Sequence, residues 1–525
     1  MVIRICNYLF FSLITYIISL SYNLKEVNRV FLLFTIFLIV FGLYYPALTT
    51  YFSQDDFFMF KVSQTNGTFS EFIKLFGAYS FEERGIAFYR PIVREVPFNI
   101  YYSLFGLNAL PFRIILFLVH FTNIYLVYLL FQNLFKKNLI SLFTAFFFGI
   151  SAANVSVLYY LAGGIETAGA TMFALFTLIF YKSYIDSSRQ RFYYCALITF
   201  VLSLASHEIN LSLPLILTVM IVTSNASKKL FLQFCKLLPF YLLLFITLYI
   251  DLFIIGFSSS EKQYQFILNI KTLIQSFIWY SLWSFGLPET LQDFVLPGLK
   301  LNPTLMRYWG DYYRIIFPTF FVSISLLLIF FLYLLKNSRK IFTDKKFLFL
   351  IFWFIMGISP VILLPFHKSS HYLSFVLPAF WGAIFYICVN TYERLKSFKS
   401  YAIAPLFLFI FSTFALSFTS VKLGENNYWA ATRGKISEKL ISDLKQKYPT
   451  LPKGAIVYFT NDPTYPFISE EWGGTSKQAS LILNGSDGVQ LLYNDPTLQV
   501  VYEDLNSSNS KFLDNNTFYI MAKVD

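Results

Sequence analysis

The sequence predicts an all-α polytopic membrane protein that ends in a small extracytoplasmic α/β domain. Of its 525 residues, 56% are hydrophobic and only 13% are charged, whereas about a quarter of the residues in soluble domains are charged. Apolar runs of about 18 to 24 residues, each long enough to cross a bilayer core about 30 Å thick, recur as far as residue 420. We therefore expect a membrane module over residues 1–420 and a soluble domain over residues 421–525.

The apolar runs predict about 11 to 12 transmembrane helices. A shorter apolar run at residues 7–22 is either a twelfth span or a helix that lies in the membrane interface. The other spans are expected at 30–49, 111–133, 139–160, 164–183, 192–206, 209–223, 238–257, 312–335, 348–366, 372–390 and 401–420.

The basic residues between the spans predict how the chain is oriented. Alternate connections are rich in lysine and arginine, whereas the short turns on the other side carry essentially only Lys368. Because basic loops stay on the cytoplasmic side, loops 50–110 and 258–311 and the tail are expected outside. The basic residues behind the net charge of +12 thus serve to orient the chain in the membrane, and no nucleic-acid partner is predicted. The richness in Phe, Ile and Lys and the lack of a sorting motif favour a bacterial plasma (inner) membrane.

The long outer segments have predicted elements of their own. Loop 50–110 contains the amphipathic stretches "FSEFIKLFGAY" and "VPFNIYYSLFGL", which are typical of helices on a membrane surface. In loop 258–311, "FILNIKTLIQSFIWYSLWSFG" is also expected to be interfacial, because a span there would invert every later loop. In the tail, we expect a helix that ends before Pro452 and strands at "AIVYFT", "VQLLYND", "TLQVVYE" and "TFYIMAKV".

The first outer loop carries the leading candidates for chemistry. Asp55 and Asp56 form an acidic pair directly after the first long span, and Tyr89, Arg90 and Arg94 follow in "FYRPIVREVPF". An arginine can fork onto a carboxylate or a phosphate. The plainer alternatives are that the acidic residues only mark a water-facing loop and that Arg90 forms a structural pair with an aspartate.

Further polar residues lie at the outer ends of later spans. One group, His207 and Glu208, lies in "LASHEINLSLP", and a second lies in "LLPFHKSSHYLSFVLP" and contains His367, Lys368, His371 and Tyr372. Burying a charge near the bilayer costs about 3 kcal/mol, so such residues usually line a cavity or are paired. Wetting by interfacial water is the alternative. Gly163 and Gly164 in "LAGGIE" suggest an outer turn, with Glu166 a possible cavity residue.

Two carboxylates and a group of cations next to lipid suit the transfer of a sugar from a polyprenyl phosphate. The cations would hold the phosphate, while a carboxylate takes a proton from the incoming acceptor. Because the departing phosphate is a weak base, no second acid is needed. The four cysteines show no paired spacing, and no histidine pair has a partner carboxylate, so neither a disulfide nor a zinc site is predicted.

The motifs "SQDDF", "YRP", "HEIN" and "SHYLSFVLP", in this order over residues 30–420, resemble those of GT-C superfamily glycosyltransferases. The resemblance is strongest to the protein O-mannosyltransferase and aminoarabinose transferase branch. It implies that Asp55 is the leading catalytic residue, which acts as base or positions the acceptor, with Asp56 as its supporting partner, and that Arg90 orients the carboxylates or touches phosphate. It also suggests His207 and His371 as contacts of the donor phosphate or pyranose, although many relatives have lysine or arginine at these two positions.

The resemblance also implies the partners of the reaction. The expected donor is a polyprenyl-phosphate-linked hexose or pentose, and the acceptor is a protein, a lipid or a glycan. Because the chain lacks the spaced carboxylate set of the oligosaccharyltransferase branch, no obligatory metal is predicted, and a divalent cation stays possible.

Two other classes of protein fit parts of the pattern. A lipid or polysaccharide transporter or flippase would usually carry polar residues near mid-membrane, broken helices or repeated halves. A surface-glycan ligase would use a pyrophosphate-linked donor and usually has its catalytic loop late in the chain. Near the start of the tail, Trp429 and Arg433 either recognise the acceptor or cap the cavity.

Overall fold

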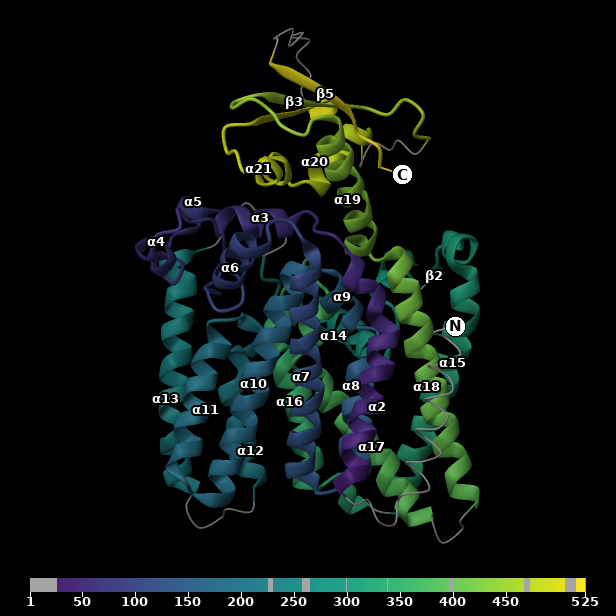
Figure 1. Cartoon of the computed structure of the whole chain (residues 1–525). Coiled ribbons are helices and arrows are strands. Elements are labelled where there is room, and N and C mark those ends of the chain that lie inside the picture. Colours follow the sequence, from purple (N-terminus) through teal and green to yellow (C-terminus); the bar gives the residue numbers. More distant parts are fainter. Residues whose placement is uncertain are drawn as a thin grey trace.

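A bundle of long helices with a small domain at one end forms the computed structural model of the chain (Figure 1). The structure describes residues 26–524 apart from 225–229, 257–264, 299, 338, 396–399, 467–472 and 506–515. The apolar run at residues 7–22, predicted to be a span or an interfacial helix, lies outside the described residues.

A helix of the bundle corresponds to each of the other predicted spans. Seven helices of the described part are long and apolar enough to cross a membrane. The bundle therefore has the predicted all-α polytopic architecture. Its helices are α2 (Glu26–Tyr44), α7 (Ala109–Phe135), α8 (Asn138–Ile150), α10 (Leu161–Ser187), α11 (Gln190–Leu204), α12 (Leu213–Thr223), α13 (Leu230–Tyr249), α15 (Pro303–Asn337), α16 (Lys345–Ile362), α17 (Leu377–Leu395) and α18 (Ser400–Asn427).

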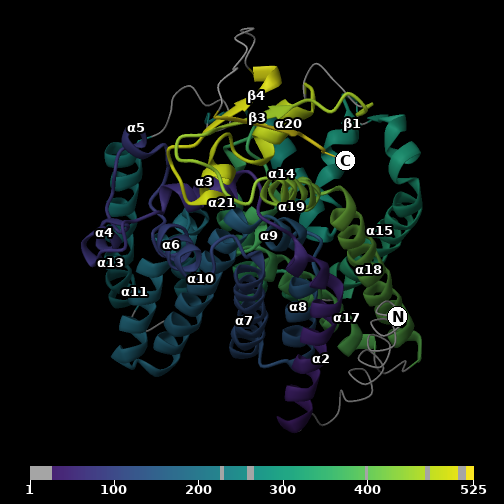
Figure 2. The same ribbon diagram turned by 45° about the horizontal axis from the view of Figure 1, so that its top comes forward.

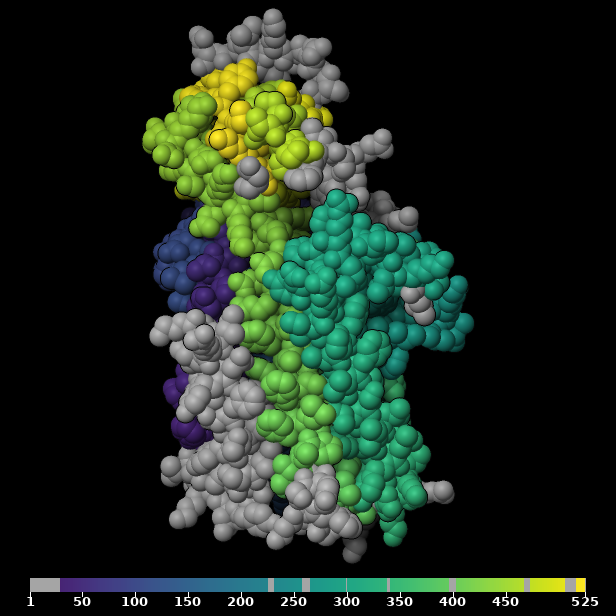
Figure 3. Space-filling view, turned by 90° about the vertical axis from the view of Figure 1, so that its right-hand side faces the viewer, coloured from purple at the N-terminus to yellow at the C-terminus, as the bar shows by residue number. Residues whose placement is uncertain are grey.

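Large apolar side chains face outward on helices of the bundle, as expected of a surface in contact with lipid. On α13, Phe231 is 82% exposed, and on α15, Phe321 is 61% exposed and Leu328 56%. Figure 3 shows α15 and α18 along one side of the molecule below the C-terminal domain. A hydrogen bond of 2.8 Å between the buried hydroxyls of Ser323 and Ser412 joins these two helices.

Several spans are shorter than predicted at the same end of the bundle. The expected span 139–160 is wrong as one helix, because α8 ends at Ile150 and a separate helix α9 (Asn154–Tyr159) follows. Asn154 Nδ2 donates to the carbonyl of Phe148 at 2.7 Å, and the Tyr44 hydroxyl donates to that of Ser151 at 2.6 Å. Such side chains satisfy the backbone where a helix is broken inside the protein.

Two further spans begin after a 3-10 turn. Turn η2 (Glu208–Ser212) precedes α12, and η8 (Ser370–Leu373) precedes α17. The outer turn expected at Gly163 and Gly164 is wrong, since both glycines lie in the first turn of α10, which begins at Leu161. The irregular segments η2, η8 and α9 each contact α10.

The long loops and the tail lie at this same end. Loop 50–110 forms α3 (Asp55–Val62), α4 (Phe69–Lys74), α5 (Phe81–Arg84) and α6 (Glu95–Phe105) beneath the C-terminal domain (Figure 1). Figure 2, with this end brought forward, shows there α14 (Ile270–Phe285) and β1 (Val295–Leu296), which pairs with β2 (Lys300–Leu301). The predicted common side of these segments is confirmed, and its outward orientation stays a prediction.

The C-terminal domain is built on a parallel sheet of order β4-β3-β5. Helix α19 (Trp429–Lys447) leads into it, and its other elements are β3 (Ile456–Thr460), α20 (Thr475–Ile482), α21 (Asp487–Tyr493), β4 (Gln499–Tyr502) and β5 (Thr517–Met521). The helix before Pro452 and three of the expected strands are confirmed. The strand expected at "VQLLYND" is wrong, because this run forms α21 and ends at Asn494 in a left-handed cap. A short apolar run fits the residue spacing of a helix as well as that of a strand, so the two cannot be told apart from the sequence.

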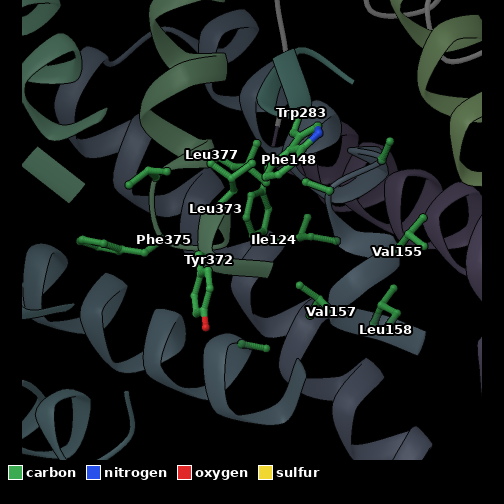
Figure 4. Close-up of a cluster of buried hydrophobic side chains, with 14 of the residues drawn as sticks. Ile124, Phe148, Val155, Val157, Leu158, Trp283, Tyr372, Leu373, Phe375 and Leu377 are labelled. Atoms are coloured by element: carbon green, nitrogen blue, oxygen red, sulfur yellow. The ribbon is translucent and has the colours of Figure 1, made fainter. Parts of the chain in front are cut away.

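A buried apolar cluster holds the irregular segments together (Figure 4). Val155 and Leu158 come from α9, Leu373 and Tyr372 from η8, and Trp283 from α14. The Tyr372 ring lies at the edge of this cluster, with its hydroxyl pointing away from the labelled apolar side chains. The cluster thereby fixes η8, which carries two of the predicted site residues.

Replacing Gly164 with alanine is expected to force α9 and α10 apart. A Cβ at this position would lie 1.8 Å from the carbonyl oxygen of Val157. We expect Gly164→Ala to destabilise the protein by about 1 to 3 kcal/mol, as overpacking of a core does, and to lower the midpoint of thermal unfolding in detergent. Gly310→Ala is the control, because its Cβ would meet only Met306 Cε at 4.0 Å. Equal midpoints for the two variants would contradict the close approach.

Candidate active site

Asp55 is the first residue of α3, and it lies at the end of the bundle where the helices are shortened. Its Oδ2 accepts a hydrogen bond of 2.7 Å from the Tyr160 hydroxyl. Its Oδ1 accepts none from the residues that the structure describes. Burial raises the pKa of the Asp55 carboxyl, while the Tyr160 hydrogen bond and the nearby Arg433 and His367 oppose this rise. The arrangement leaves one oxygen of a partly desolvated carboxylate open to a ligand.

Asp56 is enclosed by backbone donors. The Ser53 N–H donates to its Oδ2 at 3.0 Å, the Ala162 N–H donates to its Oδ1 at 2.9 Å, and the side chain is 2% exposed. Burial raises the pKa of Asp56 to about 6, against the charge of Arg113 and the two N–H groups. Because both oxygens are occupied, Asp56 ties α3 to the start of α10 and thereby positions Asp55.

Arg90 lies between two glutamates. Its guanidinium donates to Glu208 through Nε at 3.0 Å and through Nη2 at 2.5 Å, and its Nη1 donates to Glu166. The structure thus pairs Arg90 with glutamates, whereas the sequence suggested an aspartate. These contacts join loop 50–110 to α10 and to η2, so Arg90 holds the loop on the bundle. Glu166, a possible cavity residue by sequence, is buried in this ion pair.

Arg94 and Tyr89 make contacts within the same region. Arg94 Nη2 donates to Glu95 Oε1 at 2.8 Å and to the Phe88 carbonyl at 2.7 Å. The Tyr89 hydroxyl donates to the carbonyl of Phe76 at 2.8 Å. These partners lie in the loop, and the predicted contacts of Arg94 and Tyr89 with substrate stay predictions.

Three histidine rings surround Tyr372. The ring centroids of His371, His207 and His367 lie 4.1, 5.8 and 5.8 Å from that of Tyr372. Burial lowers the pKa of His207 and of His371 well below the ordinary value, so both rings are neutral at physiological pH. His207 Nδ1 accepts from the Ile209 N–H at 3.2 Å and caps η2.

The second basic motif lies closer to Asp55. The His371 ring centroid lies 5.9 Å from that of Tyr160, whose hydroxyl bonds Asp55. His371 Nδ1 is buried and has no hydrogen-bond partner among the described residues. Lys368 is half-buried, with a pKa that burial lowers, and it forms no ion pair with a described residue. The structure therefore brings His371 close to the acidic pair, while Glu208 belongs to the Arg90 ion pair.

Four residues outside the quoted motifs complete the site: Tyr160, Glu289, Trp429 and Arg433. The Trp429 ring lies 4.9 Å from that of Tyr160, and the Arg433 guanidinium lies 5.2 Å from the Trp429 centroid. Arg433 also donates to Gln54, the residue before Asp55. Glu289, from loop 258–311, accepts from the Ser370 N–H at 2.7 Å and so holds η8.

Within the described part of the chain, no three His, Cys, Asp or Glu side chains are grouped in a way that could hold a metal ion. The side chains around Asp55 offer a carboxylate, a phenol, an imidazole, an indole and a guanidinium. This set can accept a proton at one point and bind an anion at another.

Among known proteins, similarity to this chain was found in solved structures and not in sequence. No family model matches the sequence, and no curated protein matches it. Two solved structures of the oligosaccharyltransferase of Archaeoglobus fulgidus are similar. One is a complex with Zn and sulfate, with 13% identity, a TM-score of 0.44, and coverage of 86% of this chain and 61% of that one.

The other is tethered through a disulfide bond to an acceptor peptide that contains the NVT sequon. Its identity is 12% and its TM-score 0.48, with coverage of 91% of this chain and 64% of that one. This chain thus spans less than two thirds of the length of the proteins it resembles. Its activity, substrates and partners are therefore proposed from its own residues.

Removing the charge of Arg90 is expected to destabilise the fold. Arg90→Gln leaves Glu166 and Glu208 without their shared cation, which costs on the order of 3 kcal/mol for a buried pair. We expect a lower midpoint of thermal unfolding in detergent, and partial recovery in the Arg90→Gln/Glu208→Gln double variant.

Arg84→Gln is the matched control in the same loop, because among the described residues Arg84 donates only to the Val62 carbonyl, at 2.8 Å, and lies over the Tyr79 ring. Its effect should stay below about 1 kcal/mol. A midpoint of Arg90→Gln equal to that of Arg84→Gln would show that the ion pair does not hold the loop.

Proposed function

We propose that the chain is an inverting membrane glycosyltransferase, which transfers a hexosyl or pentosyl group from a polyprenyl phosphate to an acceptor on the outer face. The observation that carries this proposal is the carboxylate of Asp55. One of its oxygens is anchored by Tyr160, the other is open, and neutral and cationic nitrogen donors lie around it at the end of the bundle.

Asp55 is the base of the proposed reaction. Its open Oδ1 takes the proton of the acceptor hydroxyl while that oxygen forms a bond to the anomeric carbon of the sugar. The bond from this carbon to the phosphate oxygen breaks, and its electron pair leaves with the polyprenyl phosphate. Attack opposite the leaving group inverts the anomeric centre. The raised pKa of Asp55 makes it a stronger base than an exposed aspartate.

The donor phosphate is proposed to bind the nitrogen donors of the second basic motif. Lys368 has a cationic side chain without an ion-pair partner among the described residues, and His371 Nδ1 is open to a hydrogen bond. Because the His371 ring is neutral, it contributes a hydrogen bond and Lys368 contributes charge. Arg90 is neutralised by two glutamates and holds the loop on the bundle, as in the plainer alternative of a structural pair, but with glutamates in place of an aspartate.

The setting of the reaction belongs to the same proposal. The protein would lie in a bacterial plasma membrane with the Asp55 end outside, next to the lipid from which the donor enters. The acceptor is a protein, a lipid or a glycan, and no obligatory metal takes part. The domain boundary near residue 420 is proposed as predicted from the sequence.

Asp55→Asn is expected to abolish sugar transfer. An asparagine keeps the size and the hydrogen bond to Tyr160 but accepts no proton, and loss of a general base lowers a rate by about 10²- to 10⁴-fold. The assay incubates purified protein with a panel of polyprenyl-phosphate monosaccharides and membrane extract, and mass spectrometry follows donor consumption. Asp311→Asn is the control, because Asp311 is 97% exposed at its side chain. Undiminished transfer by Asp55→Asn would refute Asp55 as the base.

Tyr160→Phe is expected to shift the pH dependence of the reaction. The Tyr160 hydrogen bond lowers the pKa of Asp55, so its loss raises this pKa further. Because the base acts only when deprotonated, the acid limb of kcat/KM should move to higher pH. In the wild type, this limb should already lie above the ordinary aspartate value of 3.8.

Tyr159→Phe provides the control for this measurement, since the Tyr159 hydroxyl is buried without a described hydrogen-bond partner. Its acid limb should coincide with that of the wild type. If Tyr160→Phe and Tyr159→Phe have the same profile, Tyr160 does not act on the base.

A further inference from the structure

A cavity lies between loop 50–110 and the C-terminal domain, at the far end of α3 from Asp55. Its volume is about 410 Å³. The lining residues share an uncharged character. They include Ser63 and Thr65 after α3, Tyr102 and Ser103 on α6, and Asn494 after α21. No charged side chain lines it, so it is unsuited to the phosphate of the donor.

One wall of the cavity has an unsatisfied hydroxyl group. Ser63 is 0% exposed and lines the cavity, and its Oγ has no hydrogen-bond partner among the described residues. A buried hydroxyl without a partner costs about 1 to 3 kcal/mol. Next to it, Asn99 Nδ2 donates to the Ser63 carbonyl at 2.8 Å and to Thr65 Oγ1 at 3.1 Å, which fixes the wall. The Ser63 hydroxyl is covered in this structure, so a ligand hydroxyl satisfies it when a bound ligand displaces the wall residues that cover it.

Two hydrogen bonds hold the C-terminal domain against the loop beside this cavity. Lys61 Nζ donates to Gln490 Oε1 at 2.8 Å, and the Tyr102 hydroxyl donates to the Leu491 carbonyl at 2.9 Å. These contacts hold the end of α21, and with it Asn494, beside α3 and α6. The cavity thus exists only where loop and domain meet.

We propose that this cavity is a binding subsite for a neutral saccharide of the acceptor. Sugars combine hydroxyl groups with apolar C–H faces, and the cavity offers hydroxyls and amides beside the rings of Phe60 and Tyr102. Helix α3 has 8 residues, so the cavity lies roughly 12 Å from Asp55 at 1.5 Å per residue. A bound unit there would be separated from the reacting hydroxyl by further units of a glycan. The assignment of this saccharide to the acceptor rests on the proposed function.

A bulky residue at the rim tests the subsite. Ser103 is exposed on α6, and its hydroxyl donates only to the carbonyl of Asn99, at 2.8 Å, so Ser103→Trp should fill the mouth of the cavity without unfolding the protein. The matched control is Leu104→Trp, because Leu104 is 67% exposed on the same helix and does not line the cavity. Ser63→Ala removes the open hydroxyl with little change of shape.

The experiment is saturation-transfer NMR on the full chain, in a detergent without a sugar head group and without donor. The probes are neutral trisaccharides of glucose, mannose and N-acetylglucosamine, with a neutral serine-containing peptide as comparison. We expect at least one trisaccharide to bind the wild type and Leu104→Trp equally, with tenfold or weaker affinity for Ser103→Trp and a few-fold loss for Ser63→Ala.

Absence of binding by every trisaccharide, or binding that Ser103→Trp leaves unchanged, would overturn the inference. Binding of the peptide alone, lost in Ser103→Trp, would also overturn it and assign the cavity to a polypeptide. Because no donor is present, the result is independent of transfer. Transfer that depends on Asp55 without trisaccharide binding would refute only the subsite, and trisaccharide binding with transfer unaffected in Asp55→Asn would refute only the proposed function.

Discussion

The buried carboxylate of Asp56 is the contact on which the geometry of the site depends. A carboxylate taken out of water is unfavourable unless donors replace its hydration, and here the N–H groups of Ser53 and Ala162 do so. These two donors belong to the loop and to the start of α10, so that satisfying one side chain fixes two segments. The position of Asp55, the preceding residue in the chain, follows from this anchoring.

Ion pairs anchor the rest of the loop in the same way, because satisfying a buried charge joins two segments. Arg90 and Arg94 face Glu95, Glu166 and Glu208, and every one of these groups lies near the end of the bundle. The acidic groups outnumber the basic ones within this set. It is therefore a poor place for a further anion. The phosphate site proposed above uses Lys368 instead, which forms no ion pair with a described residue. Arg90 lies in the motif "YRP", but its two glutamate partners belong to the fold, so its charge holds the loop on the bundle.

The sequence predicted the membrane architecture well, because apolar length and basic loops are properties of single segments. It also predicted that the motifs gather at one end, since each lies next to the end of a span. Tyr160 and Glu289 were not found, because a single aromatic residue near a glycine pair and a single loop glutamate have no local pattern that marks a site. Trp429 and Arg433 were named from the sequence, but their contacts with Tyr160 and Gln54 were not predicted. Their roles arise from packing between segments that are far apart in the chain, such as Ser370 with Glu289. The prediction of a strand in place of α21 was wrong for a different reason. Its apolar run is too short for the spacing of apolar residues to distinguish a helix from a strand.

The contacts of Gln54 have a mechanical consequence. This residue has a positive φ of 51°, its N–H donates to the Ile482 carbonyl of the C-terminal domain at 2.7 Å, and its side chain accepts from Arg433 of α19. Gln54 immediately precedes the carboxylate at the head of α3. A shift of the C-terminal domain would thus be transmitted through a single peptide unit to Asp55. Because Gln54 links the C-terminal domain to the head of α3, a movement of that domain would also change the direction of the Asp55 carboxylate, the group proposed above as the base.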